Sequence, residues 1–365
     1  MSSTSNRYPG EVDEAYPAPF IDAPSPVTTS KPGQLPHSEI QRFFKEGYIV
    51  VKDFFSPAEL DPCREDIALM VDQLAHKLYD AGKVKSLYEE FGLFQRLTKL
   101  EEDFTGANVL LFKYQKMPLS FQRLWSNPRL LNLMEQILGP EVAGHPTWNL
   151  RTKTPRSEAV NIPWHQDSAY MSNDSYDHMI ATAWIPFLDA TPENGCMQMA
   201  RYGHRTGKVA THECCAGPTW YIMLKEENMR DTLGVDLVED VKTEPVPYGG
   251  FILFNNLIPH RSLPNESNDV RWSVDLRWQS PRHSFGFYGI QDGILFRSPD
   301  QPDLQPDWPK FFSVDRKEVW QRKYAKSVPA STGDFDTRIT GPWIGKWEIV
   351  NHNLHTGLFQ NMTSR

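Results

Sequence analysis

The sequence lacks any segment suited to a membrane or to export. No uninterrupted apolar stretch approaches the roughly 20 residues that a membrane-spanning helix needs. The polar start MSSTSNRYPGEVDE lacks the apolar core that a secretion signal needs. The ending TSR differs from the SKL form of a peroxisomal targeting signal. These absences predict a cytoplasmic protein with no membrane partner.

Basic residues are also in the minority. Lys and Arg number 38 against 46 Asp and Glu, which gives a formal net charge of -8. The basic residues are spread along the chain and form no run, so the sequence predicts no nucleic-acid partner.

Cysteine is scarce, with four residues: Cys63, Cys196, Cys214 and Cys215. They show no CxxC or CxH spacing, and the adjacent pair is a poor geometry for an ordinary disulfide. Four scattered thiols are typical of a reducing compartment.

Helices are expected in the first part of the chain. Residues 1–36 are rich in Pro, Ser and Thr, which predicts a lead-in that is disordered or draped over the surface. Ser38 and Gln41 form a capping-box pattern before a helix over 39–46, and YIVV at 48–51 predicts a strand. Further helices are predicted after Ser56 and after Asn127.

Beyond residue 140 the pattern changes to short runs rich in β-branched and aromatic residues. No helical pattern alternates with these runs, which favours an antiparallel sandwich or barrel. The aromatic residues of 283–365 predict an ordered C-terminal extension packed on the barrel. The clearest strand runs lie at 179–187, 195–200, 249–256 and 270–279.

The segment PWHQDSAY, at 163–170, contains a candidate metal site. Residues i and i+2 of a strand share a face, so His165 and Asp167 would point into one cavity. His260, which follows an apolar strand run, could supply a third ligand, because two His and one carboxylate leave open positions on an octahedral iron. HSE at 37–39 shows that H-x-[DE] also occurs by chance, so a buried histidine bonded to a nearby carboxylate stays open as the alternative.

The run VRWSVDLRWQ at 270–279 alternates strictly between apolar and polar residues. Arg271 offers a two-pronged donor matched to the far end of a dicarboxylate, and Ser273 could add a hydroxyl. On the same face, Arg277 either meets an anionic substrate group at the cavity rim or pairs with a structural Asp. The alternative is that this face is solvent-exposed on an ordinary half-buried strand.

Three ordered segments resemble the phytanoyl-CoA dioxygenase family of iron(II)- and 2-oxoglutarate-dependent oxygenases. They are HQD at 165–167, TAWIPFLDATPENGCMQM at 182–199 and PHRSLPNESNDVRWS at 259–273. The resemblance covers roughly residues 38–280. It implies a mainly β fold with flanking helices, a double-stranded β-helix of the jelly-roll or cupin-like type, as an oxygenase domain over 37–282.

The resemblance also implies the roles of particular residues. His165, Asp167 and His260 are the implied iron ligands, and Arg271 holds the distal carboxylate of 2-oxoglutarate. Four further residues are implied near the cosubstrate: Ser262, Trp184, Lys113 and Asn149. The chain departs from the family at RYGH, residues 201–204, where many members carry a PGSH-like turn. His178, His204 and His212 lie in polar loop contexts and are expected to be surface or outer-shell residues.

The implied activity is hydroxylation of a small molecule with iron(II), 2-oxoglutarate and O2, with ascorbate as a reductant. Desaturation or ring formation could use the same oxidant. The carboxylate of Asp167 argues against halogenation, since halogenases of this type carry a small residue there. A non-catalytic metal-binding sensor or scaffold and a zinc or manganese cupin are the rivals, and Arg271 argues against both. The sequence leaves the substrate and the oligomeric state open.

Overall fold

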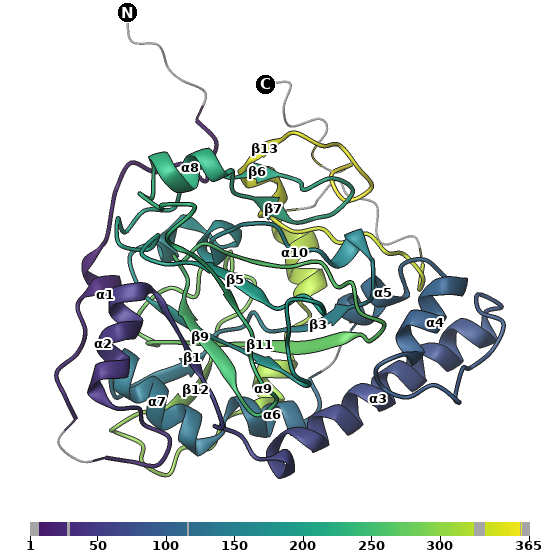
Figure 1. Ribbon diagram of the computed structural model, residues 1–365, viewed down its shortest axis with the longest axis horizontal. Coiled ribbons are helices and arrows are strands. Elements are labelled where there is room, and N and C mark those ends of the chain that lie inside the picture. The colour runs from purple at the N-terminus through teal and green to yellow at the C-terminus, as the bar shows by residue number, and fades with distance from the viewer. Residues whose placement is uncertain (1–6, 28–29, 115–116, 325–332, 358, 360–365) are drawn as a thin grey trace, which may run out of the picture.

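Antiparallel β-sheets form the centre of the molecule (Figure 1). The computed structural model describes residues 7–27, 30–114, 117–324, 333–357 and 359. The largest sheet has seven strands, in the order β1 (Tyr48–Val51), β9 (Phe251–Asn255), β4 (Ile180–Pro186), β11 (Arg271–Gln279), β2 (Val142–Gly144) and β12 (Ile294–Arg297), with β3 (Asn149–Lys153) added on β11. The mainly β class that the sequence predicts is confirmed, and the sheets agree with a jelly roll.

Two smaller sheets complete the β structure. One has the order β10 (His260–Ser262), β5 (Met197–Ala200) and β8 (Val241–Glu244). The other has the order β13 (Glu348–Ile349), β6 (Glu213–Cys214) and β7 (Ile222–Met223). Among the described strands, only β13 and β6 pair in parallel, so the antiparallel arrangement expected from the sequence is confirmed.

Seven of the described helices precede β2 in the chain. They are α1 (Ala18–Ile21), α2 (His37–Glu46), α3 (Pro57–Asp80), α4 (Arg96–Asp103), α5 (Ala107–Tyr114), α6 (Leu119–Trp125) and α7 (Pro128–Leu138). The later helices are α8 (Glu226–Asp231), α9 (Trp308–Phe312) and α10 (Arg316–Tyr324). Short 3-10 turns are η1 (Glu158–Val160), η2 (Asp167–Tyr170), η3 (Asn173–Ser175) and η4 (Ile344–Lys346).

Local capping signals predict two of the helix starts well and one badly. The Ser56 amide donates to Glu59 at 2.9 Å at the start of α3, and the Asn127 side chain accepts from the Arg129 amide at 2.9 Å at the start of α7. The expected capping box of Ser38 is wrong. Helix α2 begins at His37, directly after Pro36, so Ser38 lies inside the first turn and makes no cap bond.

Strand β11 is buried on both faces. Its apolar residues Trp272, Val274, Leu276 and Trp278 belong to the main core, which also contains residues of α3 and α6. Its polar residues, from Arg271 to Gln279, are at most 3% exposed. The strand pairs with β4 along one edge and with β3 and β2 along the other. The low exposure of both sets of side chains shows that neither face meets solvent. The alternative of a solvent-exposed polar face is therefore wrong.

The described part of the lead-in lies on the body of the protein. Phe20 is fully buried, the Tyr16 amide donates to the Gly207 carbonyl at 2.9 Å, and Asn132 donates to the Pro32 carbonyl at 2.7 Å. Of the two alternatives for residues 1–36, the described part takes the second: a buried aromatic ring and hydrogen bonds hold it on the surface despite its proline content.

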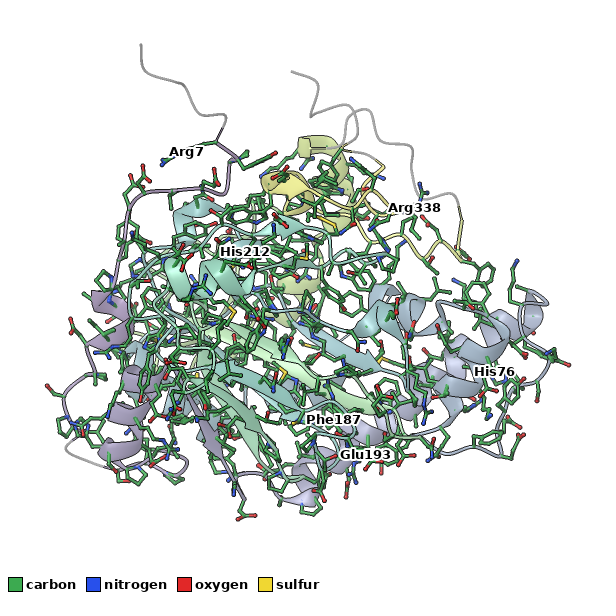
Figure 2. The ribbon with its side chains drawn as sticks, turned by 45° about the horizontal axis from the view of Figure 1, so that its top comes forward. Arg7, His76, Phe187, Glu193, His212 and Arg338 are labelled. Carbon is green, nitrogen blue, oxygen red and sulfur yellow. A yellow bond between two sulfur atoms is a disulfide. The ribbon has the colours of Figure 1, made fainter. Side chains whose placement is uncertain are left out.

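The C-terminal residues also pack on the body, where strand β13 adds to β6 (Figure 1). Trp347 is 1% exposed and Ile344 is fully buried. Figure 2 shows Arg338, the ion-pair partner of Asp336, on this segment near the edge of the molecule.

The cysteines differ from the expectation of four thiols. Cys214 and Cys215 form a disulfide, whereas Cys63 and Cys196 are free and buried. The bond joins the adjacent pair that the sequence analysis judged a poor geometry for an ordinary disulfide. None of the described helices combines the length and apolar character that crossing a bilayer requires.

Candidate metal and cosubstrate site

His165 and His260 are held side by side by their own backbones. They form an isolated antiparallel bridge in which each amide donates to the other's carbonyl at 3.0 Å. Residues that exchange both backbone hydrogen bonds carry their side chains on the same face. The ring centroids accordingly lie 4.2 Å apart, and both residues are 3% exposed.

Asp167 completes the group from a different element. It begins the 3-10 turn η2, so the expectation that His165 and Asp167 share one regular strand is wrong. Gln166 is still extended, which turns the two side chains to the same side. Asp167 Oδ1 lies 3.5 Å from His165 Nε2 and 3.8 Å from His260 Nε2. The three ligand atoms fall within 4.8 Å of one another, close enough for one metal ion.

Both imidazoles are oriented for coordination through Nε2. His165 Nδ1 lies 2.9 Å from the Pro163 carbonyl, and His260 Nδ1 lies 3.0 Å from the Ile258 carbonyl. A carbonyl accepts only from a protonated nitrogen, so Nδ1 carries the proton and the Nε2 lone pair faces Asp167. Burial, aided by His165, lowers the pKa of His260 to about 3, which keeps this ring neutral.

The charge of Asp167 is secured by its surroundings. Burial alone would raise the pKa of this carboxyl, but the charged Arg277 guanidinium paired with it holds the pKa well below its usual range. An ionised carboxylate beside two imidazoles is a donor set that suits non-haem iron(II).

Gln166, between the two candidate ligands His165 and Asp167, anchors this segment through its side chain. The sequence analysis missed this role. The Gln166 amide nitrogen donates to the Leu257 carbonyl at 2.7 Å and to the Lys208 carbonyl at 3.0 Å. Its amide oxygen accepts from the Ala210 amide at 2.8 Å. His212 accepts a 3.1 Å hydrogen bond from the Gln166 backbone amide and therefore supports the motif from behind.

Arg271 lies on the inner face of the sheet that also carries Arg277, and no carboxylate of the described residues is bonded to it. Its guanidinium donates to Ser273 and stacks 5.0 Å from the centre of the Trp184 ring. Its Nε is buried and has no hydrogen-bond partner among the described residues. Burial lowers the pKa of Arg271 to about 10, and nearby Arg151 acts in the same direction. An unsatisfied buried cation of this kind calls for an anionic ligand.

Lys153 stands beside Arg271, and the sequence analysis missed it. Its Nζ donates to Asn161 Oδ1 at 2.9 Å, to Ser262 Oγ at 3.0 Å and to the Val160 carbonyl at 3.2 Å. Burial, and then Arg271 and Arg151, lower the pKa of Lys153 well below its ordinary value. A bound anion would relieve this accumulation of positive charge.

Lys113 pairs with the C-terminal segment, and its expected place beside the cosubstrate stays a prediction. Its Nζ donates to the Asp336 carbonyl at 2.6 Å and lies 3.6 Å from the Asp336 carboxylate. The C-terminal segment, which no local signal near Lys113 reveals, supplies this partner. Asn149 does lie on the inner face, as the first residue of β3, opposite Asp275 of β11.

A small pocket lies at the cationic end of this face. Arg151, Lys153 and Arg271 line one part of it with charge. The remaining lining is mainly apolar or aromatic and comes from Phe112, Val160, Ile162 and Tyr221, with Thr152 between the charged residues.

Arg277 does not lie at a cavity rim, so that expectation is wrong. It is 3% exposed and forms a 2.9 Å ion pair with Asp167, which is the alternative that the sequence left open. The partner is the candidate metal ligand itself.

The remaining candidate histidines stay outside the central group. His204 is fully buried and bonds through Nε2 to the Phe44 carbonyl at 2.9 Å. His178 groups with Asp177 and His283, but its Nδ1 is already 2.8 Å from Asp177 and its ring stacks on His283 at 14°. Parallel stacked rings cannot both direct in-plane lone pairs at one ion, so we assign no metal to this group.

The C-terminal segment holds the turn that carries Asp167. Trp347 Nε1 donates to the Ala169 carbonyl at 2.9 Å, and Lys346 donates to the Met171 carbonyl. Tyr170 packs edge-on against His165, with ring centroids 5.5 Å apart, and contacts Trp343 at 6.2 Å. The extension therefore forms part of the wall beside the candidate metal site.

Comparison with known proteins supports the family resemblance seen in the sequence. The phytanoyl-CoA dioxygenase (PhyH) family model matches residues 43–273. A Caenorhabditis elegans protein, "Phytanoyl-CoA dioxygenase domain-containing protein 1 homolog", is 21% identical over 258 residues, covering 63% of this chain and 86% of that protein. The 1-deoxypentalenic acid 11-beta-hydroxylase of Streptomyces arenae is 28% identical over 188 residues, covering 47% of this chain and 60% of the hydroxylase.

Among solved structures, the apo form of the non-heme monooxygenase ThoJ has a similar fold. The TM-score is 0.52 at 19% sequence identity, and the match covers 76% of this chain and 96% of ThoJ. This likeness supports the fold assignment.

Proposed function

Because the chain belongs to the phytanoyl-CoA dioxygenase family of 2-oxoglutarate-dependent dioxygenases, we propose that it hydroxylates an unactivated C–H bond of a small molecule, releasing succinate and CO2. The observation that carries the proposal is the buried group of His165, Asp167 and His260 on the inner side of the sheet that also carries Arg271, whose buried Nε has no partner among the described residues. A metal-binding scaffold would need the first group and not the second.

Iron(II) would be held by Nε2 of His165, Nε2 of His260 and Oδ1 of Asp167. Bound iron(II) supplies the site at which 2-oxoglutarate and O2 generate the oxidant, with ascorbate as the external reductant. The protein contributes ligands fixed in tautomer and orientation by the Pro163 and Ile258 carbonyls.

2-Oxoglutarate would bind in the cationic part of the cavity. Its distal carboxylate suits the Arg271 guanidinium, which Ser273 and Trp184 hold in place. Lys153 and Ser262 form the second edge of this pocket, and a dianion would offset the cations gathered there. The apolar lining by Phe112, Val160 and Ile162 would exclude water from the reacting groups.

Hydroxylation is favoured over desaturation or ring formation by the likeness to the Streptomyces arenae hydroxylase, which aligns over 188 residues. The relative's own substrate is an organic acid by its name. For the present chain we propose only a small-molecule substrate, without a nucleic-acid or membrane partner.

Anaerobic titration tests the first part of the proposal. Iron(II) followed by 2-oxoglutarate should produce a weak visible charge-transfer band in the wild-type protein and none in Arg271→Met. Exposure to O2 should then give succinate in stoichiometric excess over enzyme when a matching metabolite is present. A protein that binds iron(II) but gives neither the band nor succinate would be a metal-binding scaffold instead.

A further inference from the structure

The two carboxylate oxygens of Asp167 have different surroundings. Oδ1 faces the imidazoles at 3.5 Å and 3.8 Å. Oδ2 accepts from Arg277 Nε at 3.0 Å, from Arg277 Nη2 at 2.9 Å and from Thr182 Oγ1 at 3.3 Å. Oδ2 is therefore occupied by protein donors before any metal binds.

Arg277 is itself held from behind. Its Nη1 donates to the Thr147 carbonyl at 3.4 Å, and its Nη2 lies 3.6 Å from Asp275 Oδ2. Asp275 in turn pairs with Arg151 at 2.5 Å. Charges thus alternate from Arg151 through Asp275 and Arg277 to Asp167, all of them on or facing the inner side of β11 and β3. An alternating row fixes each member more firmly than an isolated pair would.

A carboxylate that is free to rotate can bind an ion through both oxygens and so take up an additional coordination position. Because Arg277 and Thr182 occupy Oδ2, turning this oxygen toward the ion would break charge-assisted hydrogen bonds in a buried site. We propose that Arg277 is a positioning residue that presents Asp167 to the metal through Oδ1 alone and so keeps the remaining positions open for the cosubstrate. This inference rests on the proposed function, since it assumes that the group binds a metal.

The positions of Arg271 and Arg277 along β11 give a functional reason for the Arg277–Asp167 pair. Arg271, which would hold 2-oxoglutarate, and Arg277, which holds the metal ligand, lie on the same face of this one strand. The strand therefore fixes the cosubstrate anchor relative to the metal ligand. A buried ion pair with a purely structural role would need no such relation to Asp167.

The test uses Mn²⁺ as a redox-stable substitute for iron(II), and Co²⁺ as a reporter of coordination. We expect Arg277→Met to weaken Mn²⁺ binding by about 10- to 100-fold, the usual effect of losing an outer-shell partner. The visible spectrum of the Co²⁺-loaded variant should also differ from that of the wild type before any 2-oxoglutarate is added. Calorimetry and absorption spectroscopy of the full-length chain provide the two readouts.

Arg316→Met is the matched control. Arg316 is an arginine of α10 that donates to the Gln291 side chain and, at 2.6 Å, to the Pro146 carbonyl, so it also makes internal hydrogen bonds but is not bonded to Asp167. This variant should bind Mn²⁺ like the wild type and give an unchanged Co²⁺ spectrum. Equal effects of the two substitutions would mean that the loss reflects general destabilisation and would overturn the proposal.

Arg277→Lys covers the case in which Arg277→Met does not fold. Lysine keeps the charge but cannot supply the paired Nε and Nη2 donors, so Mn²⁺ binding should still weaken several-fold with an altered Co²⁺ spectrum. Wild-type affinity and spectrum in a folded Arg277 variant would overturn the positioning role. A wild-type protein that binds Mn²⁺ but never 2-oxoglutarate would contradict the proposed function. The comparison of Mn²⁺ affinity between the wild type and the Arg277 variants would remain valid.

Discussion

Lys153 lies directly opposite Arg271 in the antiparallel pairing of β3 with β11, so two cations share one face of the sheet. Both line the same cavity, and Ser262 from β10 accepts a 3.0 Å hydrogen bond from the lysine. Like charges placed opposite each other destabilise a sheet, and burial increases that cost. The juxtaposition is explained if the pocket takes up a dianion.

The first prediction concerns the cosubstrate anchor. Arg271→Lys should raise the apparent KM for 2-oxoglutarate by about tenfold or more, because a point charge loses the two-pronged geometry of the guanidinium. Steady-state succinate assays at varied 2-oxoglutarate measure the effect. An unchanged KM would place the anchor elsewhere in the protein.

The two lysines give a second, paired prediction. Lys153→Met should raise the KM for 2-oxoglutarate, whereas Lys113→Met should have the smaller effect, because Lys113 donates to the Asp336 carbonyl at 2.6 Å. Binding of 2-oxoglutarate to the Mn²⁺-loaded variants provides an independent measurement. A larger effect at Lys113 would support the role that the family resemblance implies for it.

The sequence predicts elements governed by short-range patterns and misses features that depend on strand register. The alternation of 270–279 places Arg271 and Arg277 on one face, and the Asn127 cap marks the start of α7. Which lysine stands beside Arg271 depends on the pairing of β3 with β11, and no local signal contains that register. The Arg277–Asp167 pair joins residues 110 positions apart, so it becomes visible only when the chain is folded.

A third prediction concerns the two imidazoles. His165→Ala and His260→Ala should each weaken Mn²⁺ binding by more than about 100-fold, since loss of a ligand exceeds the effect of losing an outer-shell partner. The melting temperature should stay within about 4 °C of the wild type, because the surrounding core is apolar and remains packed. Calorimetry and thermal unfolding of the same preparations test both statements. Retained metal binding in either variant would contradict the assignment of the site.

The fourth prediction links pH to the docking of the C-terminal segment. Burial lowers the pKa of Lys346 from its ordinary 10.5 to about 7, so the unfolded chain binds this proton more tightly than the folded protein. The contribution of Lys346 to stability therefore improves as pH rises from about 7 toward 10.5, and its cost is greatest below about 7. Lys346→Met should gain most over the wild type at pH 7 and lose this advantage toward pH 10. Urea unfolding at pH 7, 8 and 9 measures the gap, and parallel curves would show that Lys346 titrates alike in both states.

The last prediction concerns Asp167. Asp167→Gly removes the one anionic ligand of the group and opens a coordination position for water or chloride. Iron binding should weaken and succinate formation coupled to hydroxylation should be lost, while 2-oxoglutarate should still bind through Arg271 when iron is supplied in excess. Asp167→Glu should fare little better, because the added methylene displaces the oxygens by more than the tolerance of about 0.5 Å for a catalytic constellation. The longer side chain would also move the carboxylate away from Arg277, which donates to Asp167 Oδ2 at 2.9 Å in the wild type. Iron stoichiometry and succinate yield measured side by side decide the question, and equal values for wild type and Asp167→Gly would show that HQD is a chance occurrence of the H-x-[DE] pattern.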